Sequence, residues 1–133
     1  MPKSSKRQKR PKYTVFLSHS SLDAWVASVM AEKIEALGVK CWLDEKDLAG
    51  GDVVVEDIIR GVDACHEAIV LISPNSVKSQ WVPFEIGVVR GQKKRVTPVL
   101  NNVKPLMEPL KDIKSIDLNS FEQFLAQLKR RIS

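Results

Sequence analysis

The chain of 133 residues has a mass of 14.9 kDa, which is enough for one domain with its own core and too little for two. Hydrophobic residues make up 44% of the sequence, which excludes a globally disordered chain, and no apolar run approaches the ~20 residues of a transmembrane helix. The 21 basic residues against 16 acidic ones give a net charge of +5, a balance typical of nucleic-acid-binding proteins.

The first segment of the chain carries most of this excess charge. Residues 1–12 contain six of the basic residues, no acidic residue and no hydrophobic periodicity. When these six are subtracted from the 21, 15 basic and 16 acidic residues remain, so residues 13–133 have a net charge of −1. We therefore predict a disordered basic tail over residues 1–12 and a nearly neutral domain over residues 13–133, and we expect no nucleic-acid partner.

From Tyr13 onward, short apolar runs alternate with longer segments of helical periodicity. Five runs predict strands: residues 13–18, 39–43, 68–73, 95–100 and, more weakly, 115–118. Four segments predict helices: residues 22–37, 53–64, 79–91 and 121–132. Gly38 is the predicted end of the first helix, Pro83 falls in the opening turn of the third, and Ser120 is the predicted N-cap of the last.

Several apolar residues and both cysteines fall on positions that face the predicted core. Leu22 and Trp25 continue the apolar face of the first helix, and Trp42 lies in the second strand. Cys41 and Cys65 lie in apolar or strand-like sequence without C-x-x-C spacing, which is typical of buried thiols in a reducing compartment. Because no secretory signal follows the basic tail, we expect a cytoplasmic protein.

Strands that alternate with helices require right-handed crossovers, and these produce a parallel sheet covered on both faces. A five-stranded flavodoxin-like α/β sandwich, with strand order 2-1-3-4-5 and helices on both faces, is the natural arrangement at this length. Such sheets bind ligands beyond the carboxyl ends of their strands, at the switch point between the first and third strands. The candidate loops are therefore residues 18–23, 44–52 and 73–81.

The common ligands of this architecture have sequence signatures that this chain lacks. It contains neither the G-x-x-x-x-G-K-S/T loop of nucleoside triphosphatases nor the G-x-G-x-x-G fingerprint of dinucleotide-binding domains. Ser18 and Ser73 end strands at positions where a phospho-accepting receiver domain requires acidic residues. His19 and His66 are the only histidines of the sequence and do not cluster with a second pair of ligands, so we expect neither a metal ion nor a bound cofactor.

The motifs that remain resemble those of TIR domains of the Toll/interleukin-1 receptor family, and in particular the prokaryotic members. They follow one another over residues 13–118: F-L-S-H-S-S at 16–21, C-W-L-D at 41–44, a Gly50-Gly51 loop, I-V-L-I-S-P-N-S at 69–76, W-V-P-F-E at 81–85 and V-T-P-V-L at 96–100. Many TIR domains cleave NAD with the glutamate of a W-x-x-x-E motif. The resemblance implies an NAD glycohydrolase that releases nicotinamide and ADP-ribose or a cyclic ADP-ribose in bacterial immunity, including antiviral defence, or in signalling.

The residues of this motif suit that chemistry. Trp81 and Glu85 are four positions apart and therefore share one face of a helix, and the helix dipole near the amino terminus favours an ionised carboxylate. The cationic nicotinamide ring of NAD leaves as a neutral molecule, so a single carboxylate can suffice to stabilise the oxocarbenium-like charge. We predict that Glu85 is catalytic, that Trp81 binds the substrate, and that NAD is a substrate and not a cofactor.

Three groups of further substrate-binding candidates lie on the other loops. Ser18, His19 and Ser20 supply hydroxyls and backbone N–H groups for a ribose or phosphate, although N-capping explains Ser20 equally well. Asp44 ends the second strand, and we expect it to orient a ribose or to hold Lys46; initiation of a turn explains it equally well. The resemblance also implies that Lys46 and Leu48 lie near the pocket, and that the loop 44–52 mediates contacts between TIR domains in a homo-oligomer.

Two other functions remain open at this point. The first is a non-enzymatic TIR module that self-associates, or binds an adaptor, through the loop 44–52. The second is an enzyme similar to nucleoside deoxyribosyltransferases, which have a related fold and also act on a glycosidic bond.

Overall fold

The computed structural model describes residues 12–43, 54–76, 81–103 and 113–133, and its five strands form one parallel sheet. The strands are β1 (Thr14–Ser18), β2 (Lys40–Leu43), β3 (Glu67–Ile72), β4 (Arg95–Leu100) and β5 (Ile116–Asp117). They lie in the order β2-β1-β3-β4-β5, and every neighbouring pair is parallel. The flavodoxin-like α/β architecture and the strand order predicted from the sequence are confirmed. Residues 1–11 of the predicted tail lie outside the described residues.

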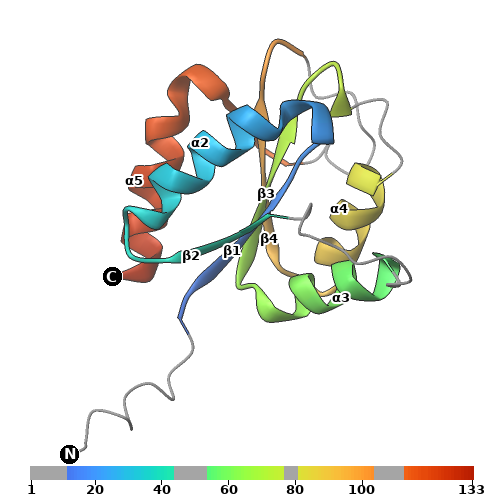
Figure 1. The fold of residues 1–133 in the computed structure, drawn as a ribbon. Helices are drawn as coiled ribbons and strands as arrows, with labels where there is room; N and C mark the ends of the chain where they lie inside the picture. The colour runs from blue at the N-terminus through green and yellow to red at the C-terminus, as the bar shows by residue number, and fades with distance from the viewer. Residues whose placement is uncertain (1–11, 44–53, 77–80, 104–112) are drawn as a thin grey trace, which may run out of the picture.

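Helices cover both faces of this sheet (Figure 1). A short 3₁₀ helix, η1 (Ser21–Asp23), leads into α2 (Ala24–Glu35), which packs on one face beside α5 (Phe121–Ile132). The other face carries α3 (Val54–Ala64) and α4 (Trp81–Gly91). Every residue of β1 and β3 is buried, as expected for central strands of a parallel sheet that is covered twice.

Both ends of α2 follow from local sequence. Ser20 Oγ accepts a hydrogen bond from Leu22 N at 3.2 Å and thereby caps η1. At the other end, Gly38 has a φ of 90°, a left-handed conformation that glycine adopts without a steric penalty. α2 itself ends at Glu35 and is shorter than predicted, and Gly38 ends the turn that follows it. Pro83, the third residue of α4, lies in the first turn as predicted.

The predicted N-cap position of the last helix is confirmed, since Ser120 directly precedes α5, but the expected side-chain cap is not formed. Ser120 makes no capping hydrogen bond with its side chain, because a 3₁₀ turn, η4 (Leu118–Ser120), precedes α5. Asp117 caps this turn instead, and its Oδ1 accepts a hydrogen bond from Asn119 N at 2.8 Å. The extra turn moves the side-chain cap three residues toward the amino terminus.

The predicted core positions of Leu22 and Trp25 are wrong. Their exposed fractions are 79% and 77%. Leu22 belongs to η1, whose tighter winding breaks the periodicity of α2. Trp25 precedes the buried Ala27 by two residues, which places it about 200° around the helix and on the side away from the sheet.

Trp42, in contrast, packs as predicted. Its ring stacks on Phe16 with 5.0 Å between centroids. Gly61 of α3 makes room for it, because a Cβ atom at Gly61 would lie 2.6 Å from the indole ring. Cys41 and Cys65 are both buried, as predicted, and burial raises the pKa of the Cys65 thiol.

The amino end of β3 holds a buried carboxylate that ties α5 to the sheet. Glu67 is 1% exposed and accepts two hydrogen bonds from Arg131, from Nε at 3.0 Å and from Nη2 at 2.7 Å. The hydroxyl of Tyr13 donates a hydrogen bond to Glu67 Oε2 at 2.5 Å. Burial, followed by this hydrogen bond and the negative charge of Glu67, raises the pKa of Tyr13 to about 12.

Candidate functional site

A buried carboxylate and a serine hydroxyl meet at the carboxyl end of β1. Ser18 is the last residue of β1, and its Oγ donates a hydrogen bond to Oε1 of Glu85. Glu85 is the fifth residue of α4 and only 1% exposed. Val82, Ile86 and Val89 anchor α4 on the sheet at helical spacing, and this orientation turns Glu85 inward with them. The topology thus joins two of the predicted site residues across 67 positions of sequence.

This arrangement can stabilise positive charge. Water is largely excluded around Glu85, so a cationic group placed beside it would interact more strongly than in bulk solvent. The hydrogen bond from Ser18 fixes the orientation of the carboxylate. Glu85 also lies close to the amino terminus of α4, the positive end of the helix dipole.

The other predicted residues of the first loop also line the end of β1. His19 is 4% exposed and Ser20 is 8% exposed. The hydroxyl of Ser20 is engaged in capping η1, so the capping role left open by the sequence is the one observed.

A second hydrogen-bond network, which the sequence patterns do not predict, joins the loops after β1 and β3. Asp23 accepts hydrogen bonds from Ser73 Oγ at 2.5 Å and from Asn75 Nδ2 at 2.9 Å. Ser73 Oγ in turn accepts from the backbone N–H groups of Asn75 at 3.0 Å and Ser76 at 3.2 Å. Asp23, Ser73 and Ser76 are all buried. The two loops that flank the switch point are therefore fixed relative to each other.

The turn-forming sequence Ser73-Pro74-Asn75-Ser76 signals a tight loop, but it does not identify Asp23 as its partner. The two segments are 50 positions apart, and only the parallel pairing of β1 with β3 brings them together. We assign Asp23 a positioning role, because its carboxylate is occupied by the loop after β3.

The remaining predicted site residues cannot be compared with the structure. Asp44, Lys46 and Leu48, together with the loop 44–52, lie outside the described residues. The backbone of Trp81 opens α4, but its side chain also lies outside the described part of the structure.

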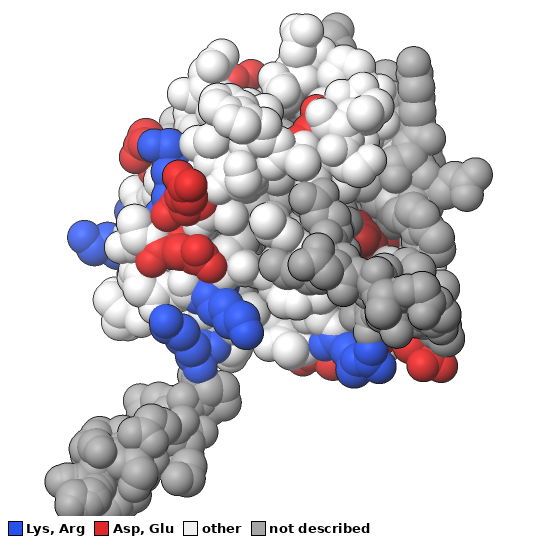
Figure 2. Space-filling view, in the orientation of Figure 1, with Lys and Arg blue, Asp and Glu red and all other residues white. Residues whose placement is uncertain are grey.

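The described residues contain no group of three His, Cys, Asp or Glu side chains placed to hold a metal ion. Among the helices of the described ranges, none has the length and apolar character needed to cross a bilayer. On the face shown in Figure 2, acidic and basic side chains of the described residues are interspersed and do not gather into one large patch of a single sign.

A family model for the TIR domain matches residues 15–131 of the chain. Human Toll-like receptor 6 is 31% identical over 80 residues, an alignment that covers 59% of this chain and 10% of the receptor. The chain therefore corresponds to a small part of the curated relatives that it matches.

Solved structures with the same fold include a TIR domain and an enzyme. The TIR domain of the Toll-related receptor TRR-2 from Hydra magnipapillata superposes with a TM-score of 0.72 at 19% identity, covering 88% of this chain and 94% of that one. The 2-desoxiribosyltransferase from Leishmania mexicana superposes with a TM-score of 0.69 at 18% identity, covering 89% and 97%. At these identities the likeness concerns the fold alone.

Proposed function

The chain belongs to the TIR domain family, and from this premise we propose that it is an NAD glycohydrolase that cleaves the bond between nicotinamide and ribose. The products are nicotinamide and ADP-ribose or a cyclic ADP-ribose. The observation that carries the proposal is the buried carboxylate of Glu85, held by Ser18 at the carboxyl end of β1.

The proposed reaction begins with the break of the C1′–N bond of the substrate. The electron pair of that bond stays with nicotinamide, which departs neutral, and positive charge develops on the ribose ring. The ionised carboxylate of Glu85 stabilises this positive charge. The interaction between Glu85 and the ribose is therefore stronger in the transition state than in the bound substrate. Water then adds to C1′ and loses a proton, which gives ADP-ribose; attack on C1′ by a nucleophile of the adenosine half of the same molecule gives a cyclic product instead.

The Ser18 hydrogen bond suggests how the substrate engages Glu85. A ribose hydroxyl is chemically equivalent to the serine hydroxyl and can take its place on Oε1, so the carboxylate keeps a hydrogen-bond donor when substrate binds. Asp23 supports the site by holding the loop after β3 against the loop after β1. Trp81 is proposed to contact the substrate from the first turn of the same helix.

Incubation of the purified full chain with NAD, followed by chromatography of the products, tests this function. We expect nicotinamide and either ADP-ribose or its cyclic form, and we expect Glu85→Gln to remove both products. Glu32→Gln is the matched control, because Glu32 is an exposed carboxylate on α2. If the wild-type chain releases no nicotinamide even at high protein concentration, the proposal is wrong. Release of free base from deoxynucleosides but not from NAD would support the deoxyribosyltransferase alternative.

A second candidate function, self-association as a signalling module, is favoured by the exposed apolar pair Leu22 and Trp25. Leu22 lies on η1 and Trp25 at the start of α2, a few residues after Ser18 at the end of β1. Sedimentation of the wild-type chain and of Trp25→Glu separates the two functions. Assembly that Trp25→Glu abolishes, in a chain without NAD cleavage, would favour this module.

A further inference from the structure

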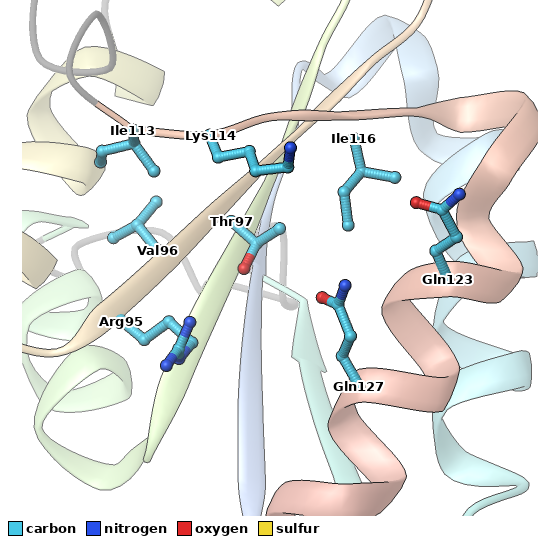
Figure 3. A pocket seen from close by; sticks show the side chains of 8 residues that line it. All are labelled: Arg95, Val96, Thr97, Ile113, Lys114, Ile116, Gln123 and Gln127. Carbon is cyan, nitrogen blue, oxygen red and sulfur yellow. The ribbon is translucent and has the colours of Figure 1, made fainter.

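A pocket of about 200 Å³ lies between β4 and α5 (Figure 3). Eight residues line it: Arg95, Val96, Thr97, Ile113, Lys114, Ile116, Gln123 and Gln127. Arg95 begins β4 and pairs in register with Glu67 at the start of β3, whereas the candidate active site follows the ends of β1 and β3. The pocket therefore lies toward the opposite end of the sheet and is separate from Glu85.

The short edge strand leaves this space open. β5 has two residues, which pair only with Val99 and Leu100 of β4. Among the described residues, no strand covers the amino-terminal half of β4 on this side. Gln123 and Gln127, four positions apart on α5, share the face of the helix that borders the pocket. Figure 3 shows Gln127 pointing from α5 toward Thr97 on β4.

The polar side chains that line the pocket are available to bind a ligand. Arg95 and Lys114 contribute two positive charges, and no acidic residue is among the described residues that line the pocket. Within the described ranges, none of Arg95, Thr97, Lys114, Gln123 and Gln127 takes part in a side-chain hydrogen bond or an ion pair. The pocket thus presents two cationic groups, two amides and a hydroxyl without a protein acceptor, which is the chemistry of an anion site.

The other residues that line the pocket are apolar, and they favour a ligand whose uncharged part is also apolar. Val96 and Ile116 are buried and Ile113 is half-buried. A cavity of about 150 Å³ holds one benzene molecule, so this pocket has room for a single ring with a charged substituent.

A peptide that adds a strand to the edge of β4 is a poorer fit. Asn101 donates its backbone N–H to Ile72 of β3, so by alternation the even-numbered residues of β4 direct their backbone groups toward the open edge. One of these is Pro98, which has no N–H to donate, so within the described ranges Val96 is the one residue of β4 with a free edge donor beyond the reach of β5.

We propose that this pocket binds a small organic anion, a carboxylate or phosphate monoester on a body about the size of one ring. Arg95 and Lys114 hold the anionic oxygens, and Ile113 and Ile116 contact the apolar body. This binding does not depend on NAD cleavage by the chain.

Titration of the full-length protein with benzoate, phenyl phosphate, benzamide and inorganic phosphate, followed by backbone amide NMR, tests the proposal. We expect benzoate or phenyl phosphate to shift the signals of residues 95–97, 113–116, 123 and 127. Benzamide, which lacks the charge, and inorganic phosphate, which lacks the apolar body, should bind at least tenfold more weakly. The tighter of the two organic anions identifies the preferred headgroup.

Lys114→Met and Arg95→Met should each weaken binding about tenfold, which corresponds to about 1.4 kcal/mol. Both residues are exposed, so these variants should remain folded. Gln127→Trp should block the pocket from α5, and Lys129→Met is the control because Lys129 is exposed on α5 outside the pocket. No shift at millimolar ligand, equal loss in Lys129→Met, or inorganic phosphate binding as tightly as phenyl phosphate would each overturn the proposal.

Discussion

Replacing Arg131 by methionine leaves the Glu67 carboxylate buried without its cationic partner. In the wild-type chain, Glu67 is 1% exposed and receives two hydrogen bonds from Arg131 at 2.7 and 3.0 Å. Removing one partner of such a buried pair costs about 3–5 kcal/mol, because the remaining charge stays desolvated. The side chain of Arg131 is 23% exposed, which favours the lower end of this energy range. We therefore expect the free energy of unfolding to fall by about 3 kcal/mol.

Urea denaturation followed by circular dichroism measures this loss as a change in the free energy of unfolding. Arg130→Met is the matched control: Arg130 is the exposed neighbour on α5, so its replacement should change stability by less than about 0.5 kcal/mol. Adding Glu67→Gln to Arg131→Met should recover part of the loss, because no buried charge then remains. A loss below about 1 kcal/mol in Arg131→Met, or an equal loss in both arginine variants, would refute the reasoning.

Three further predictions concern packing, the loops and pH. Gly61→Ala should destabilise the chain by about 1–3 kcal/mol in urea denaturation, because the new Cβ would lie 2.6 Å from Trp42; Gly87→Ala, with nothing within 4 Å, should be neutral or stabilising. Asp23→Ala should cost about 1–3 kcal/mol by releasing the loop after β3, and should also lower the rate of nicotinamide release; an unchanged rate would contradict its positioning role. Folding raises the pKa of Tyr13 from 10.0 to about 12, so the unfolded chain loses this proton first and stability should fall as pH rises from 10 to 12; Tyr13→Phe should flatten that slope in denaturation curves.

Most of the fold could be predicted because it depends on local patterns. The apolar runs identified all five strands, and their alternation with helices led to the parallel order observed. The predictions differ from the structure where a 3₁₀ turn precedes a helix: η1 changes the face that Leu22 and Trp25 occupy, and η4 has Asp117 as its side-chain cap. β3 begins at Glu67, one residue before the predicted third strand, because hydropathy does not anticipate a charge buried by a distant arginine.

The candidate site was predictable only in part, because its contacts join residues that are far apart in the sequence. Periodicity and topology indicate that the ends of β1 and β3 share one edge of the sheet. They do not specify that Ser18 bonds to Glu85, or that Asp23 bonds to Ser73, because these pairs are 67 and 50 positions apart. Such contacts depend on how far α4 and η1 rotate over the sheet.

The rate of nicotinamide release by Glu85→Gln, compared with the wild-type chain and with Glu32→Gln, tests the central claim most directly. The substitution keeps the shape of the side chain and removes its negative charge. Loss of one electrostatic stabiliser of a transition state costs about 10²–10³ in rate. We predict a loss of at least 100-fold in Glu85→Gln, wild-type rates in Glu32→Gln, and unchanged circular dichroism in both. Equal rates in all three proteins would contradict the assignment of Glu85 as the catalytic residue.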